Sequence, residues 1–470
     1  MHSKGWDFWM INENFAFLNK IIENIINDTE KQRTLYLGGL TKTLEDVFKN
    51  LGFQDNFNEP VKNILIVKLD NVGDFILLSP SIRTIRENFP AAHITLVVNK
   101  RVYPLAELCP YVNEVLPFEL EYAVEANDVV QTMKIILEFV KNHLWKRKFT
   151  LGFEFRYFSS EKFKHLLMLY LSGARERIGY ISDAERLYTD NLLPPESNIG
   201  NILLTHPVLN PPEIIHDCAR NLYILQDYGL KITRTDLEVW YNSSDLYLAR
   251  ALLNNFAEGR IKVSVGIGAS TPMRKYPREK YLQAFKEIID KGGSIVILGG
   301  PGEYEDAKFL EENLSSEFVK NIIPIQPGWR IDAAIMSQTD LYIGNDTGAS
   351  NCAAAVHLPI IMLSREAKDR EPILTGLLSE YTMYYPWQTN AIVLRPEHAI
   401  GECANIFAMG GCNAGTSHCI AQIDPAEIVA AYEKIVDFIK FSGIRKTSCP
   451  PMINALQATQ MLQSRFTAPK

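Results

Sequence analysis

The pattern of hydrophobic and polar positions divides the chain into an N-terminal segment and a longer body. Over residues 11–28, apolar side chains recur every three or four positions, with Asn, Glu and Lys opposite, which predicts an amphipathic helix. Its polar face is not rich in Lys and Arg, so packing on the protein explains it better than binding to a membrane. A second helical stretch follows at 41–53, and the first strong strand begins at Asn63. Residues 1–60 are therefore expected to form a helical extension.

From Asn63 onward, short apolar runs alternate with helical stretches. Strands are expected at 63–69, 93–99, 114–118 and 149–155, and helices at 79–89, 103–108, 122–146 and 162–173. Strands that alternate with helices predict parallel βαβ units in a doubly wound sheet. Residues 192–215 are rich in Pro and Asn and read as irregular, and a helix is expected at 216–229.

A second series of the same kind begins near residue 261. Strands are expected at 261–268, 294–300, 341–345 and 359–363, and helices at 278–292, 303–314, 331–339, 348–357 and 425–441. The chain therefore reads as α/β, with two Rossmann-like parallel-sheet domains that face each other across a cleft. We expect the domains to span 61–245 and 246–424, with the C-terminal helix and tail, 425–470, packing back on the N-terminal domain.

Composition narrows the class of protein. The 470 residues are 47% apolar and 22% charged, which suits a globular protein of several domains. A net charge of −7 argues against a broad nucleic-acid-binding face. The seven cysteines form no dense framework, the start lacks a signal-peptide pattern, and no apolar stretch reaches membrane-spanning length. We therefore expect a cytoplasmic protein.

The first candidate site is the turn between strand 63–69 and the helix after it. In open parallel sheets, ligands bind beyond the carboxyl ends of the strands. Asp70 lies directly at the strand end, where shaping the turn is a sufficient role. Asp74 follows Gly73 at the start of the next helix, so it is a candidate general base, although capping of the helix would also explain an acid there.

The second candidate site is the loop at 266–277. Ser270 and Thr271 lie among small residues that let backbone amides approach an anion, and Arg274 and Lys275 can neutralise phosphate. A surface loop with two solvated cations fits this stretch equally well.

The third candidate site is the segment 341–356. Its apolar run ends in Asp346, Thr347 and Gly348, and the small residues that follow should start a helix with its positive dipole end toward the cleft. A diphosphate suits that position. Simple N-capping by Asp346 or Thr347 is the alternative.

Together, the three segments resemble glycosyltransferase family 9, the heptosyltransferase family of the GT-B fold, over roughly residues 62–440. "ILIVKLDNVGDFILLSPSIRTIRENFP" is similar to the family's N-terminal signature, "RKYP" to its Lys-Arg-Trp-Pro motif, and "DAAIMSQTDLYIGNDTGASNCAAAVHLPIIML" to its nucleotide-sugar signature. The resemblance implies an N-terminal acceptor domain and a C-terminal nucleotide-sugar domain.

The resemblance also implies the reaction. An inverting transferase would move a sugar, heptose from ADP-heptose in the best-known members, to a hydroxyl of a lipopolysaccharide or related glycoconjugate, without a metal or cofactor. Asp74 matches the family's general base, and Glu303 falls near an acid that can hold the donor ribose. The remaining positions that match the donor site are Arg274, Lys275, Asp346, Thr347 and Gly348. Fixed cations and a helix start can meet the charge of the leaving diphosphate.

Two departures from the family pattern bear on the substrate. Asn351 stands where the family commonly has His, and the usual Gly after the next strand is replaced in "IIMLSREAKDREP". With the N-terminal extension, these changes leave other functions open. The enzyme could use another donor or a lipid-linked or protein acceptor, with peripheral contact at the inner membrane, or the protein could be an inactive sugar-nucleotide-binding scaffold. A dehydrogenase would need Gly-x-Gly-x-x-Gly after the first strand, which "DNVGDF" lacks.

A cysteine-rich segment and several aromatic residues are weaker candidates. Cys403, Cys412, His418 and Cys419 could bind a metal, but no Cys-x-x-Cys pair occurs, so a structural role or buried thiols are favoured and no metal site is predicted. Trp329 and the aromatic stretch from Tyr381 could stack on a base or sugar, although packing is their commoner role.

Overall fold

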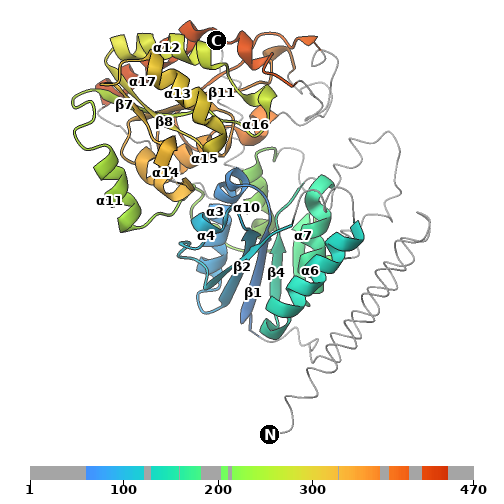
Figure 1. Cartoon of the computed structure of the whole chain (residues 1–470). Helices are drawn as coiled ribbons and strands as arrows, with labels where there is room; N and C mark the ends of the chain where they lie inside the picture. Colours follow the sequence, from blue (N-terminus) through green and yellow to red (C-terminus); the bar gives the residue numbers. More distant parts are fainter. Residues whose placement is uncertain are drawn as a thin grey trace, which may run out of the picture.

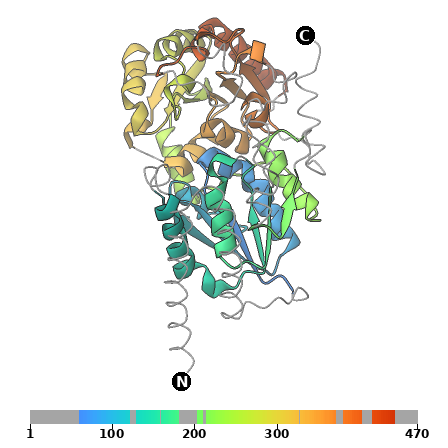
Figure 2. The ribbon, with the colours of Figure 1, turned by 90° about the vertical axis from the view of Figure 1, so that its right-hand side faces the viewer.

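The computed structural model describes residues 60–120, 129–157, 159–180, 203–209, 214–325, 328–370, 380–401 and 415–442. In these residues the chain forms two six-stranded parallel sheets, each with helices on both faces (Figure 1). The two sheets belong to separate layered bodies that lie one above the other in the views of Figures 1 and 2. The helices expected at 11–28 and 41–53 lie outside the described residues. No helix in the described ranges is both long and apolar enough to cross a membrane.

The N-terminal sheet has the strand order β3-β2-β1-β4-β5-β6. Its strands are β1 Asn63–Lys68, β2 His93–Asn99, β3 Glu114–Phe118, β4 Leu151–Glu154, β5 Glu176–Tyr180 and β6 His206–Val208. Its helices are α3 Val72–Asn88, α4 Tyr103–Ala106, α6 Val129–His143, α7 Ser159–Leu171 and α10 Asp217–Asp227, with a 3-10 turn at Trp145–Arg147. The sequence pattern missed β5 and β6, which are short, and β6 lies in the stretch read as irregular.

The central strand β1 has a continuous apolar sequence because both faces of the sheet are covered. Ile64 and Ile66 belong to the core under α3 and α10, whereas Leu65 and Val67 belong to the core under α6 and α7. In register, Ile64 pairs with residues of both β2 and β4, so β1 lies in the middle of the sheet. Its carboxyl end is thus a fixed platform for the residues that follow it.

Helix α3 begins at Val72, earlier than the start predicted at residue 79. Pro80 lies inside this helix and has no N–H to donate to the carbonyl of Ile76. The Ser79 hydroxyl donates to that carbonyl instead, at 2.7 Å. The hydroxyl therefore compensates for the proline, and Asp74 lies in the first helical turn.

The C-terminal sheet has the order β12-β11-β10-β7-β8-β9. Its strands are β7 Ile261–Gly266, β8 Gly293–Leu298, β9 Val319–Asn321, β10 Leu341–Asn345, β11 Ile360–Leu363 and β12 Ala391–Leu394. Its helices are α11 Ser243–Leu252, α12 Arg278–Asp290, α13 Tyr304–Asn313, α14 Gly328–Met336, α15 Gly348–Ala355, α16 Glu380–Tyr384 and α17 Pro425–Ser442. Short 3-10 turns occur at Pro272–Arg274, Pro301–Glu303, Ile323–Ile325, Lys368–Arg370 and Ile420–Gln422.

Both sheets have the same doubly wound topology. The direction of winding reverses between β1 and β4 in the first sheet and between β7 and β10 in the second. Ligands of such sheets bind at these reversal points, outside the carboxyl ends of the strands. All three candidate motifs begin at strands that flank a reversal point.

Helix α17 corrects one expectation. It packs on α12, β11 and β12 of the C-terminal sheet, not on the N-terminal domain. Its apolar face joins the core that contains Val263 and Phe285, and Lys291 on the same domain contacts Glu433 at 2.6 Å. The apolar stripe that predicted this helix therefore covers the sheet that precedes it in the chain. Residues 443–470 lie outside the described residues.

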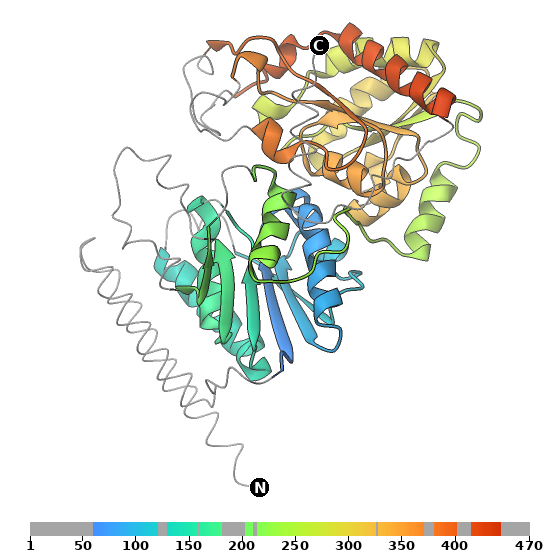
Figure 3. The same cartoon turned by 180° about the vertical axis from the view of Figure 1, so that it is seen from behind.

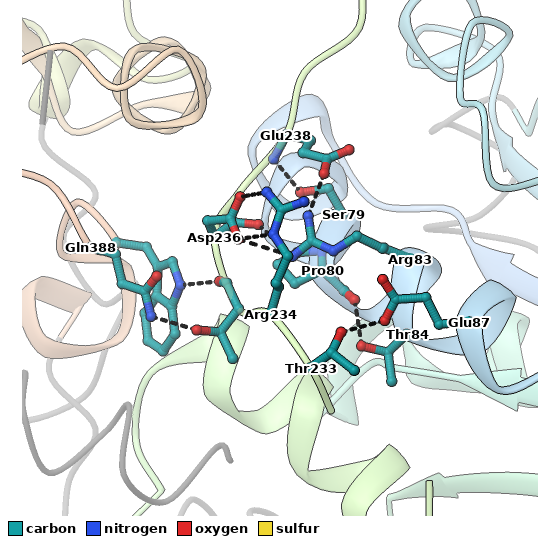
Figure 4. Close-up of polar contacts among 12 residues, drawn as sticks. Ser79, Pro80, Arg83, Thr84, Glu87, Thr233, Arg234, Asp236, Glu238 and Gln388 are labelled. Atoms are coloured by element: carbon teal, nitrogen blue, oxygen red, sulfur yellow. Dashed lines mark hydrogen bonds and ion pairs between the residues drawn. The ribbon is translucent and has the colours of Figure 1, made fainter. Parts of the chain in front are cut away.

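The segment that connects α10 to α11 is held by both domains (Figure 4). On the N-terminal side, Arg83 of α3 forms ion pairs with Glu238 and Asp236, and the Glu238 amide donates to the Ser79 hydroxyl at 2.9 Å. On the other side, the Trp387 indole donates to the Thr235 carbonyl at 2.7 Å. The connection is thus fixed against the helix that carries Asp74.

Candidate active site

The first and third motifs meet between the two domains. A Cβ atom added to Gly73 would lie 3.1 Å from the Cα of Gly348, and one added to Gly348 would lie 3.0 Å from the Gly73 nitrogen. The N-termini of α3 and α15 therefore touch through two residues without side chains. Chain segments 275 positions apart share one site because each follows a strand at the reversal point of its own sheet.

Asp74 lies at this contact, in the first turn of α3. Asn71 is the N-cap and makes no side-chain cap hydrogen bond, and no hydrogen bond to the Asp74 carboxylate occurs among the described residues. Burial and then the negative charge of Asp70 raise the pKa of Asp74 to about 6. Such a carboxylate is ionised at neutral pH and is more basic than an ordinary Asp, which suits a general base. Among the described residues, the Asp74 side chain makes no hydrogen bond that would cap α3.

Asp70 has a different environment. Its carboxylate contacts the Lys68 ammonium at 2.9 Å and forms an ion pair with Arg156, and all but about 1% of its side chain is buried. Burial opposes ionisation, but Lys68, Arg156 and His165 together lower the pKa of Asp70 well below its usual range. Asp70 thus ties the end of β1 to the segment after β4. Sequence reasoning assigned Asp70 to the turn but missed Lys68 and Arg156, because nothing in the pattern shows that β4 lies beside β1.

On the C-terminal side, Asn345 orders the second motif. Its Nδ2 donates to the carbonyls of Ile267 and Gly268 at 3.1 and 3.0 Å, and its Oδ1 accepts from the Tyr276 amide at 3.2 Å. The last residue of β10 therefore holds the loop that follows β7. Asn345 was also missed from sequence, since an amide at a strand end reads as part of the turn.

Thr347 and Asp346 lie at the start of α15. Thr347 is the N-cap residue, but its side chain makes no cap hydrogen bond; its carbonyl accepts from the Ser350 hydroxyl at 2.7 Å. The Asp346 amide donates to the Leu363 carbonyl at 3.0 Å, which fixes the turn to the neighbouring strand β11. The N-terminus of α15 lies at the contact with Gly73, and the first amides of a helix are suited to an anion.

The second motif lies beside this point. Ser270 is exposed, while the Thr271 Oγ1 is buried with no hydrogen-bond partner in the described part of the chain. Arg274 ends the 3-10 turn at Pro272–Arg274. Lys275 contacts Asp306 of α13 at 2.5 Å, so its ammonium already has a partner on its own domain.

Glu303 and Asn351 border the same site. Glu303 accepts from the Gly300 amide at 2.9 Å, and a Cβ on Gly268 would lie 2.8 Å from its other carboxylate oxygen, so it faces the end of β7. Asn351 is only 6% exposed, and its Nδ2 would lie 3.1 Å from a Cβ on Gly73. Its Oδ1 has no partner among the described residues.

The weaker candidates lie apart from this site or in packing positions. His418 Nδ1 lies 3.0 Å from Cys419 Sγ, whereas Cys403 and Cys412 fall outside the described residues. Within the described ranges, no three His, Cys, Asp or Glu side chains form a metal-binding group. Trp329 packs against Gly348, and Trp387 is buried between the domains.

Comparisons with known proteins relate the chain to one family. The model of glycosyltransferase family 9 (heptosyltransferase) matches residues 202–396, which contain the second and third motifs. Lipopolysaccharide heptosyltransferase 2 of Escherichia coli (strain K12) is 21% identical over 315 residues, 64% of this chain and 82% of that protein.

Two solved structures show the same fold. The glycosyl transferase family 9 structure from Veillonella parvula has a TM-score of 0.62 at 18% identity and covers 82% of this chain and 100% of its own. The E. coli ADP-heptose lps heptosyltransferase II has a TM-score of 0.56 at 17% identity, with 80% and 99% covered. The two-domain α/β architecture is therefore the GT-B fold, and residues 202–396 match the model of glycosyltransferase family 9, the family that the sequence motifs resemble.

Proposed function

We propose that this glycosyltransferase inverts the configuration of the sugar it transfers, and that Asp74 is its general base. The observation that supports the proposal best is the contact of Gly73 with Gly348, which puts the Asp74 turn beside the start of α15. The base and the anion-binding start of α15 would then lie on opposite sides of the anomeric carbon, as direct displacement requires.

The reaction follows from these positions. Asp74 takes the proton of an acceptor hydroxyl while the hydroxyl oxygen forms a bond to the anomeric carbon. The bond from that carbon to the diphosphate oxygen breaks, and the nucleoside diphosphate leaves with the electron pair. Attack from the face opposite the leaving group inverts the anomeric centre. The leaving diphosphate is stable as an anion, so no second acid has to protonate it.

Donor binding is assigned to the C-terminal domain. The amides of Gly348 and its neighbours, the Arg274 guanidinium and the unpartnered Thr271 hydroxyl are suited to the diphosphate. Glu303, in the 3-10 turn after β8, is suited to the ribose hydroxyls. The proposed donor is ADP-heptose, which the name of the E. coli structural relative includes.

The acceptor is proposed to be a hydroxyl of a lipopolysaccharide or related glycoconjugate, reached in the cytoplasm with peripheral contact at the inner membrane. The family relative whose name includes lipopolysaccharide supports this class. Asn351, which stands where the family commonly has His, is the reason to test donors and acceptors other than those of the relative as well.

Binding and turnover test the proposal in two steps. Calorimetry with ADP, UDP and NAD should show binding of ADP, and mass spectrometry should show transfer of one heptose from ADP-heptose to a heptose-containing acceptor. NAD binding without ADP binding would refute the transferase assignment. ADP binding with no turnover on glycan, lipid-linked or protein acceptors would identify a sugar-nucleotide-binding scaffold.

A further inference from the structure

A second carboxylate, Asp217, lies on the N-terminal side of the site. Helix α10 packs along α3, and the two helices are seen side by side from behind in Figure 3. The Asn221 side-chain amide of α10 donates to the Leu77 carbonyl of α3 at 3.4 Å. Both helices follow strands of one parallel sheet, so they start at the same edge. About one turn toward that edge from Leu77 and Asn221 lie Asp74 and Asp217.

Asp217 is buried and has no ionic partner in the part of the chain that the structure describes. The residue is 6% exposed, and its carboxylate makes no hydrogen bond or ion pair with any described residue. It is not needed to cap α10, because His216 Nδ1 accepts from the Cys218 amide at 3.2 Å. Buried carboxylates are normally paired or hydrogen-bonded. An unpaired one at the edge of a ligand site is available to accept a hydrogen bond from a bound molecule.

The cations nearby are already engaged. Lys68 lies 2.9 Å from Asp70, and Arg156 forms an ion pair with the same carboxylate. The charge of Asp217 acts on Lys68 and Asp74, and the third cation of this region, Arg220 of α10, donates to the Ile214 carbonyl at 3.2 Å. Two carboxylates, Asp74 and Asp217, thus remain as acceptors of hydrogen bonds.

Tyr384 of the C-terminal domain lies near both acids. Tyr384 of α16 has its pKa raised well above the usual range, first by burial and then by the charges of Asp74 and Asp217. Its hydroxyl therefore stays protonated beside both acids. A molecule bound here meets two carboxylates from one domain and a neutral phenol from the other, which suits a polyhydroxylated ligand.

We propose that Asp217 binds a hydroxyl of the acceptor sugar next to the hydroxyl that Asp74 deprotonates, so that the site selects acceptors with two neighbouring hydroxyl groups. The proposal rests on the proposed function. Each carboxylate accepts one hydroxyl proton: Asp74 removes its proton during transfer, whereas Asp217 keeps its hydrogen bond throughout. Sites built to bind a hydroxyl discriminate strongly against analogues that lack it.

The test compares wild-type protein and Asp217→Asn, with ADP-heptose as donor and methyl heptoside or its monodeoxy analogues as acceptors. The variant should lose roughly 10- to 100-fold in kcat/KM for methyl heptoside, as expected for a hydrogen bond to a charged group. It should keep the wild-type Kd for ADP. With the wild-type protein, kcat/KM for one monodeoxy analogue should be lower than for methyl heptoside by a similar factor. Asp217→Asn should lower kcat/KM for that analogue little further.

The pH profile separates binding from a merely structural role. Lys68 and Asp70 of the β1 end, Arg156 after β4 and Asp217 of α10 are the charged groups that act on Asp74. Removing the negative charge of Asp217 should move the acid limb of kcat/KM to lower pH, which a general loss of packing would not do. Asp227→Asn, at the far end of α10, is the matched control and should change neither acceptor specificity nor the acid limb.

The outcomes distinguish this proposal from the proposed function. If the wild-type protein neither binds ADP nor transfers a sugar, the proposed function fails. If the protein transfers heptose but the loss in kcat/KM from Asp217→Asn multiplies with the loss from the deoxy analogue, Asp217 does not select the acceptor. The same conclusion follows if the methyl heptoside neither binds nor reacts. A Kd for ADP that rises with Asp217→Asn would likewise overturn the assignment.

Discussion

Gly73 and Gly348 hold the backbones of the two domains in direct contact, with the Gly348 Cβ position 3.0 Å from the Gly73 nitrogen. Gly73 lies in the first turn of α3 and Gly348 begins α15, and each of these helices follows a central strand of its own sheet. The separation between the proposed base and the proposed diphosphate site is therefore set by backbone atoms. A side chain at either position would change that separation directly.

Gly348→Ala should lower kcat/KM by roughly tenfold or more, since displacements of about 1 Å in a reacting geometry cost about 100-fold. Because one buried cluster includes both Phe75 of α3 and Cys352 of α15, the free energy of unfolding is measured as well, which separates a loss of packing from a loss of reacting geometry. Gly415→Ala is the control, since a Cβ there meets no atom within 4 Å. Steady-state kinetics and urea unfolding give the two readouts. Equal kinetics for both variants would show that the contact does not limit catalysis.

Asp74→Asn should keep the Kd for ADP but lose about 10²- to 10⁴-fold in turnover, the usual contribution of a general base. The raised pKa of Asp74, about 6, also predicts the pH dependence of the wild-type protein. Because only the ionised carboxylate accepts a proton, kcat/KM should fall about tenfold per pH unit below about pH 6. Activity that stays flat down to pH 5 would exclude Asp74 as the base.

Arg274→Ala should weaken ADP binding more than Lys275→Ala. The Lys275 ammonium contacts Asp306 at 2.5 Å, and the same carboxylate contacts Arg278 at 3.2 Å. Lys275 would have to give up this ion pair in order to bind the diphosphate. Calorimetry with ADP measures both variants. Similar losses would mean that Lys275 leaves Asp306 when the diphosphate binds.

Asp332→Asn should stabilise the protein at pH 8 by roughly 2 kcal/mol, with a smaller gain at pH 5. Burial raises the pKa of Asp332 to about 7, and its Oδ1 has no partner among the described residues. The folded carboxyl stays protonated while the unfolded one ionises, so the wild-type free energy of unfolding falls as pH rises from about 4 toward 7. Urea denaturation at both pH values measures this, with the exposed Asp290→Asn as control. An equal change at both pH values would assign the effect to packing instead.

Much of the fold could be predicted because the strongest strands are buried on both faces. The runs at 63–69 and 93–99 match β1 and β2, which are buried on both faces, and the run at 114–118 matches the edge strand β3, which is only partly buried. The edge strand β6 has only three residues and one buried side chain, so neither length nor periodicity marks it. Helix α11, also missed, is set by a capping box between Asn242 and Asp245 in a segment with no strong apolar run.

The site was harder to predict where its residues act through tertiary contacts. The turn around Asp74 and the start of α15 each carry a local signal, since small and acidic residues follow an apolar run. Asp217 carries none, because an acid in the first turn of a helix is ordinary. Its meaning depends on α10 lying beside α3, and single-sequence patterns do not specify such a packing.

The meeting of α3 and α15 also has an electrostatic consequence. Each helix presents the positive end of its dipole, equivalent to about half a charge, to the other. Two like ends in contact repel, and Asp74 supplies a negative charge on one side only. Under the proposed function, a diphosphate bound beside them would add a second negative charge and offset the remaining repulsion. The contact of the two helix starts should therefore be more stable with the nucleotide bound than without it.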